Sequence, residues 1–420
     1  MDNHLQDWLK LDNAAKIYPA TSSRKSPAQF RLSVKMKENI NYNAIYAAWE
    51  AMLKRCPYFH VHLKQGFFWY YLQYYDQIPP IQLWHKFPDI FETHLNTAEL
   101  ILLSIRDNII SLDFSHVLTD GNGSMRFFLG LIYEYLRQSG YQVKNPDQIP
   151  SPEEEVQLSE IEDAHRKYFP GNLPSPENMS AAFYLPGKLA EEYNFITGEM
   201  PLSDALQLAH ESNVSLTTYL TAVYIESLKI MADKYKSHRK SSTIRLQVPV
   251  NMRRFFPSNT MRNFSLYVSP EIDLKLGDYD FKEILEKVDL SVKLQTDPKE
   301  LSRQISRNVG GELNPIVRLV PRLFKNLYLA GLYSRLGERC YSGILSNLGK
   351  IDVEASALPH ISSFDVLVLP NYKIKKACAA YTFADKLSVT FGSVVPNREL
   401  ERHFFSHFAS NGIDVTIREY

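Results

Sequence analysis

The six residues His116-Val117-Leu118-Thr119-Asp120-Gly121 bring an imidazole, a carboxylate and a glycine together on a short stretch of chain. They follow the strand-like run LILLSIRDNIISLDFS (100–115) and precede an aromatic-rich helical pattern, and loops that leave strands often present reactive groups. Acyl transfer needs a base beside the acceptor nucleophile and a group that fixes the orientation of that base. His116 and Asp120 are our candidates for these two roles. The alternative is a histidine satisfied by local hydrogen bonds, with Asp120-Gly121 serving only as a turn.

The elements that must position this motif alternate between strand and helix patterns through the first half of the chain. Ser124 is expected to cap the helix that follows the motif, and Gly140 to end it. Apolar spacing predicts a helix over 44–57 and strands over 30–36, 59–75 and 100–116.

A proline-rich acidic stretch over 141–187 separates two halves of similar make-up, and we interpret it as a solvated crossover. The sequence predicts an N-terminal domain over 1–165 that carries the motif, a linker over 166–185 and a C-terminal domain over 186–420. In the second half, helices are predicted over 201–235 (broken near Asn213), 280–295 and 401–412, and strands over 243–255, 263–274, 341–351, 387–395 and the residues after 412.

Composition and charge argue against several classes of protein. With 47 Lys+Arg against 47 Asp+Glu the chain has no net charge, which argues against nucleic-acid binding through phosphate contacts. No run approaches the roughly 18 apolar residues of a membrane span, and the three cysteines form no C-x-x-C pair. The sequence thus predicts a cytoplasmic monomer without a transmembrane segment or a metal site. Two histidine pairs lack a third zinc ligand, namely His60/His62 and His403/His407.

The string LDFSHVLTDGNGSMRFFLGLIYEYL resembles the active-site segment of the chloramphenicol-acetyltransferase-like superfamily. That superfamily includes peptide condensation domains, plant BAHD acyltransferases, mycobacterial polyketide-associated acyltransferases and alcohol acetyltransferases. The resemblance covers nearly the whole chain. A single histidine in the motif and the absence of a D-F-G-W-G signature favour the alcohol acetyltransferase branch. Further segments resemble the superfamily in the same order, namely AIYAAWEAMLKRCPYFHVHL, SLTTYLTAVYIESL, VPVNMRRFFP followed by N-F, ILSNLGKI and LSVTFGSVVPNRELERHFFSHF.

The resemblance implies an α+β fold in which two chloramphenicol-acetyltransferase-like domains form a pseudo-dimer around a solvent tunnel. His116 would lie midway along the tunnel as the general base. Asp120 would face away from the substrate and pair with an arginine that holds the loop. Arg253 is the expected partner, with Arg254 as the second choice.

The resemblance also implies roles in binding. Gly121 would let the chain turn tightly, and its N–H could face the developing oxyanion. Ser346 and Asn347 fall on a strand that would line the tunnel, unless SNLG is a plain turn before Gly349.

The implied activity is transfer of an acyl group from a thioester, with acyl-CoA as co-substrate, to the hydroxyl of a small-molecule acceptor, or less readily to an amine. No tightly bound cofactor is expected. An acyltransferase fed by an acyl carrier protein and a non-catalytic binding module on the same fold stay open as alternatives. For two further segments the sequence leaves two structural interpretations open. The ring-rich run 67–75 is either a ligand wall or a half-buried sheet. The basic segment 301–340 is either a basic amphipathic surface for acyl-donor phosphates or a membrane, or a helix packed on its own domain with its arginines reaching the solvent.

Overall fold

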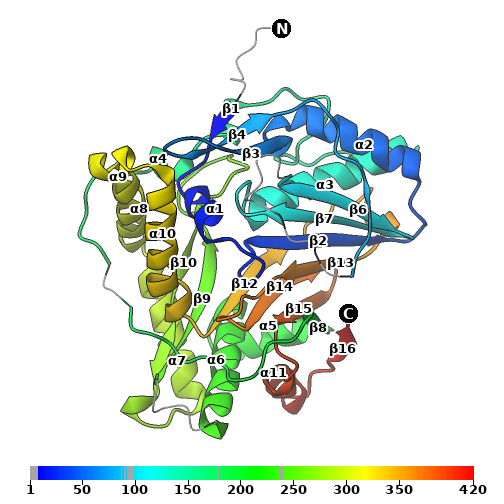
Figure 1. Cartoon of the computed structure of the whole chain (residues 1–420). Helices are drawn as coiled ribbons and strands as arrows, with labels where there is room; N and C mark the ends of the chain where they lie inside the picture. Colours follow the sequence, from blue (N-terminus) through cyan, green and yellow to red (C-terminus); the bar gives the residue numbers. More distant parts are fainter. Residues whose placement is uncertain (1–7, 87, 89–90, 92–98, 177–178, 236–240) are drawn as a thin grey trace.

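The computed structural model describes residues 8–86, 88, 91, 99–176, 179–235 and 241–420. Within these residues the strands form sheets of five, eight and three strands, and helices cover the two larger sheets (Figure 1). The expected α+β class is confirmed. No helix of the described residues is long and apolar enough to cross a membrane.

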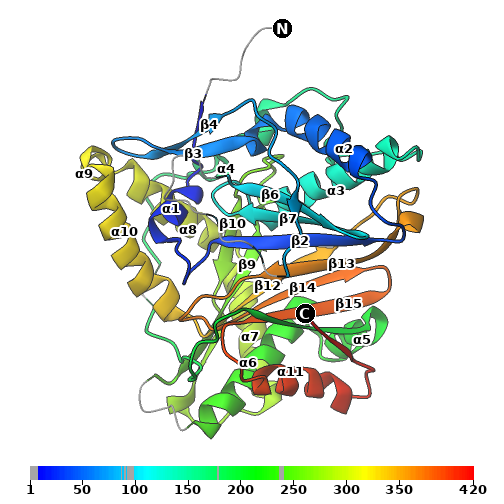
Figure 2. The same ribbon diagram turned by 45° about the vertical axis from the view of Figure 1, so that its right-hand side comes forward.

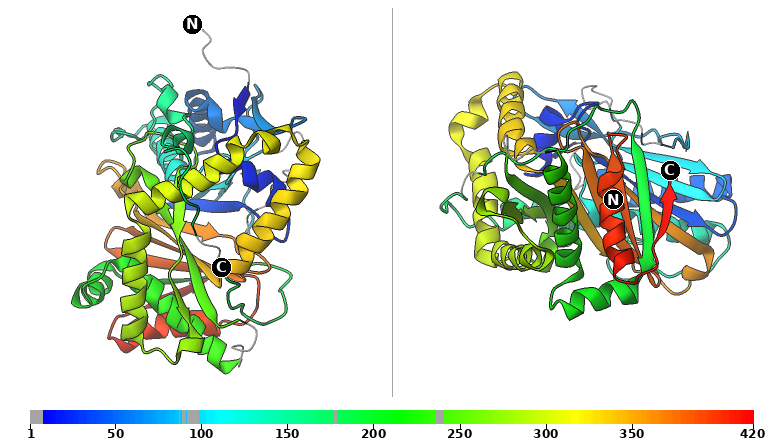
Figure 3. Two further views of the ribbon diagram at one scale, coloured as in Figure 1. Left: turned by 90° about the vertical axis from the view of Figure 1, so that its left-hand side faces the viewer. Right: turned by 90° about the horizontal axis from the view of Figure 1, so that it is seen from below.

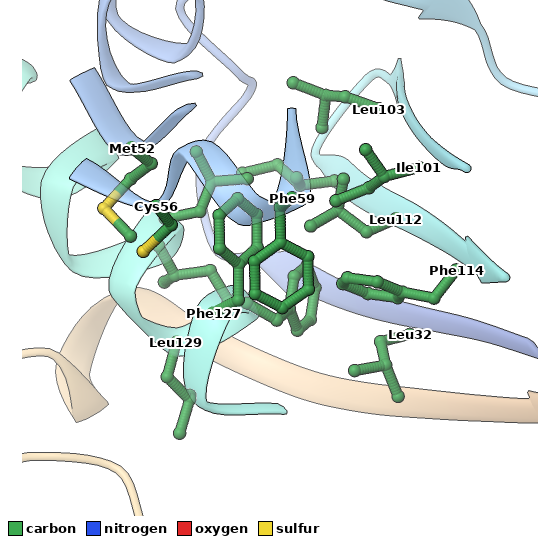
Figure 4. Close-up of a cluster of buried hydrophobic side chains, with 14 of the residues drawn as sticks. Leu32, Met52, Cys56, Phe59, Ile101, Leu103, Leu112, Phe114, Phe127 and Leu129 are labelled. Atoms are coloured by element: carbon green, nitrogen blue, oxygen red, sulfur yellow. The ribbon is translucent and has the colours of Figure 1, made fainter. Parts of the chain in front are cut away.

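The five-stranded sheet carries the His116 motif at the end of one of its strands. Its order is β13-β2-β7-β6-β5, and helices α2 (Tyr42–Arg55) and α3 (Gly121–Gln138) pack against it. Figure 4 shows the buried rings between sheet and helices, where Phe59 stacks on Phe127 at 4.5 Å between ring centroids. The strands are β2 (Gln29–Met36), β5 (Gln82–Leu83), β6 (Ile101–Arg106), β7 (Ile109–Ser115) and β13 (Ile361–Val368).

The eight-stranded sheet belongs to the second half, and Figures 1 and 2 show its helices α5, α6, α7 and α11 below it. These helices bury a second apolar core against the sheet. Strand order is β10-β9-β12-β14-β15-β8-β16, with β11 paired to β9. The strands are β8 (Asn194–Pro201), β9 (Thr243–Asn251), β10 (Ser265–Val268), β11 (Glu271–Asp273), β12 (Gly343–Lys350), β14 (Lys376–Phe383), β15 (Lys386–Ser393) and β16 (Thr416–Glu419); the helices are α5 (Leu202–Glu211), α6 (Leu216–Lys234), α7 (Phe281–Gln295) and α11 (Glu399–Ser410).

The predicted two-domain division needs one correction, because β13 lies in the other half's sheet. The division places 361–368 in the C-terminal domain, but β13 pairs antiparallel with β2 from Ile361↔Met36 to Val368↔Phe30. A strand pattern shows that a segment is extended and does not show which sheet it joins, so the local sequence could not reveal this crossing. The described part of the linker is irregular after α4 (Ala164–Lys167) until an isolated bridge joins Ala182 to Thr243.

Helices from the 301–340 segment pack on the first half of the chain. The amide of Arg322, at the start of α10, donates to the carbonyl of Phe67 at 2.9 Å, in the turn between β3 and β4. Helix α10 also contacts its own half, where Nζ of Lys373 donates to the Ser334 hydroxyl at 2.7 Å, so it packs on both halves. Most of β4 is only half-buried, which supports the sheet interpretation of 67–75. The elements are β1 (Trp8–Lys10), β3 (Val61–Gln65), β4 (Tyr70–Tyr74), α1 (Tyr18–Thr21), α8 (Pro298–Leu313), α9 (Pro315–Leu319) and α10 (Arg322–Leu336).

We expect the fragment 1–165 not to fold alone, because β2 would lose β13 and present an open edge. A chain cut within 172–175, where the residues are exposed, should keep its structure, since strand pairing holds the two pieces together. Circular dichroism and thermal melting of both preparations check this. A cooperative melt of isolated 1–165 would contradict it, and co-expression with 166–420 is the control.

Candidate functional site

Strand β7 delivers His116 to the site, directly after Ser115. The amide of His116 donates to the carbonyl of Ala28 at 2.9 Å, which fixes the backbone next to β2. The imidazole lies against Phe30, at 4.7 Å between ring centroids, and stacks on Tyr18 at 5.3 Å. Two aromatic neighbours therefore hold a ring that is only partly buried.

The hydrogen bond of the imidazole defines its tautomer. Nδ1 of His116 lies 3.3 Å from the carbonyl oxygen of Thr119, and a carbonyl can only accept. Nδ1 therefore carries the proton, and Nε2 keeps a lone pair. Burial lowers the pKa of His116 below its ordinary value, against the opposing effects of the Thr119 carbonyl and the Asp120 charge. This direction favours the neutral ring, which is the form that can accept a proton.

Asp120, and not Ser124, caps helix α3. One carboxylate oxygen, Oδ1, accepts from the amides of Asn122 at 3.2 Å and Gly123 at 3.0 Å. Ser124 lies inside the first turn, where its hydroxyl donates to the Gly121 carbonyl at 3.1 Å. Both residue types favour the N-cap position, but a carboxylate has a second oxygen that remains free for another partner.

The second oxygen of Asp120 binds the other half of the chain. Oδ2 accepts from Nη1 of Arg253 at 2.9 Å and from the amide of Phe264 at 2.7 Å. Burial would raise the pKa of Asp120, but the charge of Arg253 and these hydrogen bonds outweigh it and hold the pKa below its ordinary value. Among the described residues the carboxylate thus makes four hydrogen bonds, and none of them joins it to the His116 ring. Asp120 therefore holds the loop and does not share the imidazole proton.

Arg253 uses all five of its N–H groups. Besides Asp120, it donates to the side chain of Asn251 and to the carbonyls of Thr260 and Arg262. A guanidinium with every donor satisfied is fixed in position, as a buried ion pair requires. Arg254, the second choice for this role, is exposed.

Residues 260–264, which we call the clamp segment, hold the motif loop by further contacts. The amide Nδ2 of Asn263 donates to the carbonyl of His116 at 3.0 Å and to the buried carboxylate of Asp12 at 3.1 Å. The hydroxyl of Thr119 donates to the carbonyl of Met261 at 2.6 Å. Sequence reasoning missed Asn263, Asp12 and Thr119. The sequence pointed to this region only through the Asn263-Phe264 pair after the arginine turn, and that pair does not show which atoms its side chains contact.

Gly121 does not adopt the tight-turn conformation that was expected of it. Its φ is not positive, and a Cβ built on it would lie 3.8 Å from Leu348, an ordinary contact. Gly123 is the constrained glycine, since a Cβ there would lie 2.1 Å from the Met261 carbonyl oxygen and 2.3 Å from the Thr119 hydroxyl. The clamp segment can approach the start of α3 only because residue 123 has no side chain.

The contact between Leu348 and Gly121 also places β12 beside the motif. Asn347, on the same strand, donates from Nδ2 to the Thr217 hydroxyl at 2.8 Å and accepts from the Gly349 amide at 2.9 Å. The SNLG segment therefore lies in strand β12, next to a bulge, and is not a free turn. Ser346 lies one residue before Asn347 and is partly exposed.

No group of three or more potential metal ligands exists among the described residues. His60 and His62 both pack on the ring of Tyr75, at 4.1 and 3.8 Å between centroids. His407 is engaged by Glu226 at 2.9 Å and by the Tyr219 hydroxyl at 3.0 Å. His60, His62 and His407 thus each have an aromatic or hydrogen-bonding partner within the protein.

No protein-family model and no curated protein matches the chain. Solved structures match it over nearly its whole length. TRI101 of F. graminearum, complexed with coenzyme A and deoxynivalenol, has a TM-score of 0.66 and 9% identity over 97% of this chain and 99% of that one. Polyketide synthase associated protein 5 from Mycobacterium tuberculosis has a TM-score of 0.60 and 12% identity, with 96% and 97% covered. The condensation domain of the monacolin K polyketide synthase MokA has a TM-score of 0.57 and 11% identity, with 97% of both chains covered.

These comparisons define the class of fold. The chain has the α+β fold that TRI101 and the condensation domain share, as the sequence predicted. Within that fold the structure brings His116, Asp120, Gly121 and Arg253 to one place and sets β12 beside them.

Two glycine substitutions form a matched pair. Gly123→Ala should lower the free energy of unfolding by about 1–3 kcal/mol, because the new Cβ must displace the clamp segment. Gly121→Ala, two residues earlier on the same helix, meets no close atom and should leave stability unchanged. Chemical denaturation of both variants checks this. Equal stabilities would contradict the close approach at Gly123.

Asp120→Asn should destabilise the fold by about 3–5 kcal/mol, because it leaves a buried arginine without its counter-charge. Asp278→Asn is the control, since Asp278 pairs with Lys229 while its side chain is 86% exposed, and its melting temperature should not change. Thermal melting with activity assays separates folding from chemistry. An Asp120→Asn protein with an unchanged melting temperature would refute the orienting role.

Proposed function

We propose that this chain transfers an acyl group from an acyl-CoA thioester to the hydroxyl of a small-molecule acceptor, with His116 as the general base. The observation that carries the proposal is the donation of Nδ1–H of His116 to the Thr119 carbonyl, which leaves Nε2 as a neutral base. The coenzyme A present in the TRI101 structure supports this donor. We place the acceptor and donor in a tunnel between two domains that meet at Asp120 and Arg253.

The reaction needs no group beyond the two substrates. Nε2 of His116 takes the proton of the acceptor hydroxyl while its oxygen bonds to the thioester carbonyl carbon. The tetrahedral intermediate then collapses, the carbon–sulfur bond breaks, and His116 returns the proton to the leaving thiolate. No acyl-enzyme forms, which agrees with the state of the cysteines. All three are buried, and burial raises the pKa of Cys56 to about 12.

The oxyanion of the intermediate would form near the start of α3, at the positive end of the helix dipole, where Asp120 already accepts from the amides of Asn122 and Gly123. We assign the amide of Gly121 as one donor and the hydroxyl of Ser346 on the neighbouring β12 as a second candidate. Asn347 is already held by Thr217 and Gly349, so we assign it to positioning the strand.

An acyl carrier protein remains the second candidate donor, since a condensation domain of a polyketide synthase shares the fold. In either case the acyl group arrives as a thioester on a phosphopantetheine arm. Competition between acyl-CoA and acyl carrier protein in a thiol-release assay identifies the donor. The alcohol acetyltransferase branch, the monomeric state and the cytoplasmic location stay predictions from the sequence.

Replacing the base tests the proposal. His116→Ala should reduce kcat/KM by about 10²–10⁴-fold, because general-base catalysis contributes this much. Its melting temperature should fall little, since the ring donates only one long hydrogen bond. His210→Ala is the control, because His210 is exposed. In the wild type, activity should fall with decreasing pH through a pKa below about 6.5.

The outcomes are distinguishable. Near-normal turnover by a folded His116→Ala protein would end the role of His116. Absence of thiol release from any acyl-CoA or carrier donor by the wild type would favour a binding module.

A further inference from the structure

Helices α9 and α10 present an unusual row of apolar side chains to solvent. Five large residues between positions 319 and 328 are each about two-thirds or more exposed. The first ends α9, and the other four lie on α10 at positions 323, 324, 327 and 328, a spacing that places them on one side of that helix. Monomeric soluble proteins rarely expose so many large apolar groups together. They are Leu319 (74%), Leu323 (68%), Phe324 (65%), Leu327 (75%) and Tyr328 (64%), which we call the apolar ridge.

The turn between β3 and β4 extends the ridge. The carbonyl of Phe67 accepts from the amide of Arg322, and the carbonyl of Phe68 accepts from Nζ of Lys325 at 3.1 Å. The two rings are 73% and 41% exposed. In Figure 2, α10 lies at the left edge of the molecule, and the left view of Figure 3 also shows this helix. The ridge and the turn thus form one apolar surface from both halves of the chain.

The charge around this surface has one sign. Residues 301–340 contain seven Lys/Arg against two Asp/Glu. Both acids are buried and paired with cations, Glu312 with Lys16 and Glu338 with Lys373. Arg318 is exposed beside the ridge. Arg307 and Arg339 are exposed as well, whereas Arg322 and Lys325 donate to the turn between β3 and β4.

We propose that the apolar ridge, with Phe67 and Phe68, docks this protein on the surface of a membrane that contains anionic lipid. Leucine and aromatic side chains on one face of a helix, with basic residues beside them, enter the boundary between headgroups and acyl chains. Anionic headgroups attract the neighbouring arginines.

If the proposed acyl transfer holds, the docking surface has a consequence for the acceptor. Helix α10 packs on α1, and Tyr18 of α1 stacks on His116. The membrane would then lie one helix away from the base. An acceptor of the lipophilic alcohol class, held in the same membrane, would be delivered close to His116. Docking itself is measured without any substrate, so its test is independent of the acyltransferase assignment.

Co-sedimentation of the whole protein with phosphatidylcholine vesicles, with and without phosphatidylglycerol, tests the proposal. We expect binding to the anionic vesicles that weakens in high salt, because screening reduces the attraction between arginines and headgroups. Leu327→Asp and Phe324→Asp should each lower the partition coefficient by about tenfold or more, since each removes an apolar contact and adds a repelled charge. Leu290→Asp on α7 is the matched control, because Leu290 is also 67% exposed and should leave binding unchanged.

Light scattering of the same proteins distinguishes the other occupant. A wild-type dimer that Leu327→Asp converts to a monomer would show that a second copy covers the ridge, and would overturn the proposal. Failure to bind anionic vesicles, or equal loss in Leu290→Asp, would overturn it as well.

Discussion

The ion pair between Asp120 and Arg253 is the contact on which the arrangement of the site depends. One oxygen of the carboxylate caps the start of helix α3. The other oxygen binds Arg253 of the second half, whose five N–H donors are all engaged. Removing these charges from water costs free energy, and only a complete set of hydrogen bonds offsets that cost. The loop that carries His116 is therefore tied to the second half by its own aspartate, and the base is fixed without touching the carboxylate.

The separation between the carboxylate that holds the loop and the carbonyl that binds the imidazole also explains the chemistry that we assign to His116. In a triad of the serine-hydrolase type a carboxylate accepts the Nδ1 proton and stabilises the imidazolium. Here the Thr119 carbonyl takes that place, which sets the same tautomer with a weaker preference for the charged form. A neutral base can take the proton of the acceptor hydroxyl and then return that proton to the leaving thiolate.

Local patterns predicted much of the fold, because the strand pair over 100–116, the helix over 44–57 and the break near Asn213 depend on neighbouring residues. Three features escaped. Ser124 and Asp120 are both good caps, and only the distant Arg253 decides between them. Gly123 is explained by a carbonyl from Met261, more than 130 positions away. Strand β13 was missed because its partner comes from the other half. All three depend on tertiary contacts that a pattern cannot contain. The Arg253 assignment came from the resemblance.

The crossing of β13 has a consequence for the order of events during synthesis. Met36 pairs with Ile361, about 325 residues later. At 5–20 residues per second, the ribosome needs roughly 16–65 s to supply the partner of β2 after β2 itself has been made. During this interval the edge of β2 that β13 will cover has no partner, and unpaired strand edges invite pairing with other chains. A nascent chain of this protein is thus a natural client for factors that shield emerging strands, in particular while its central third is being translated.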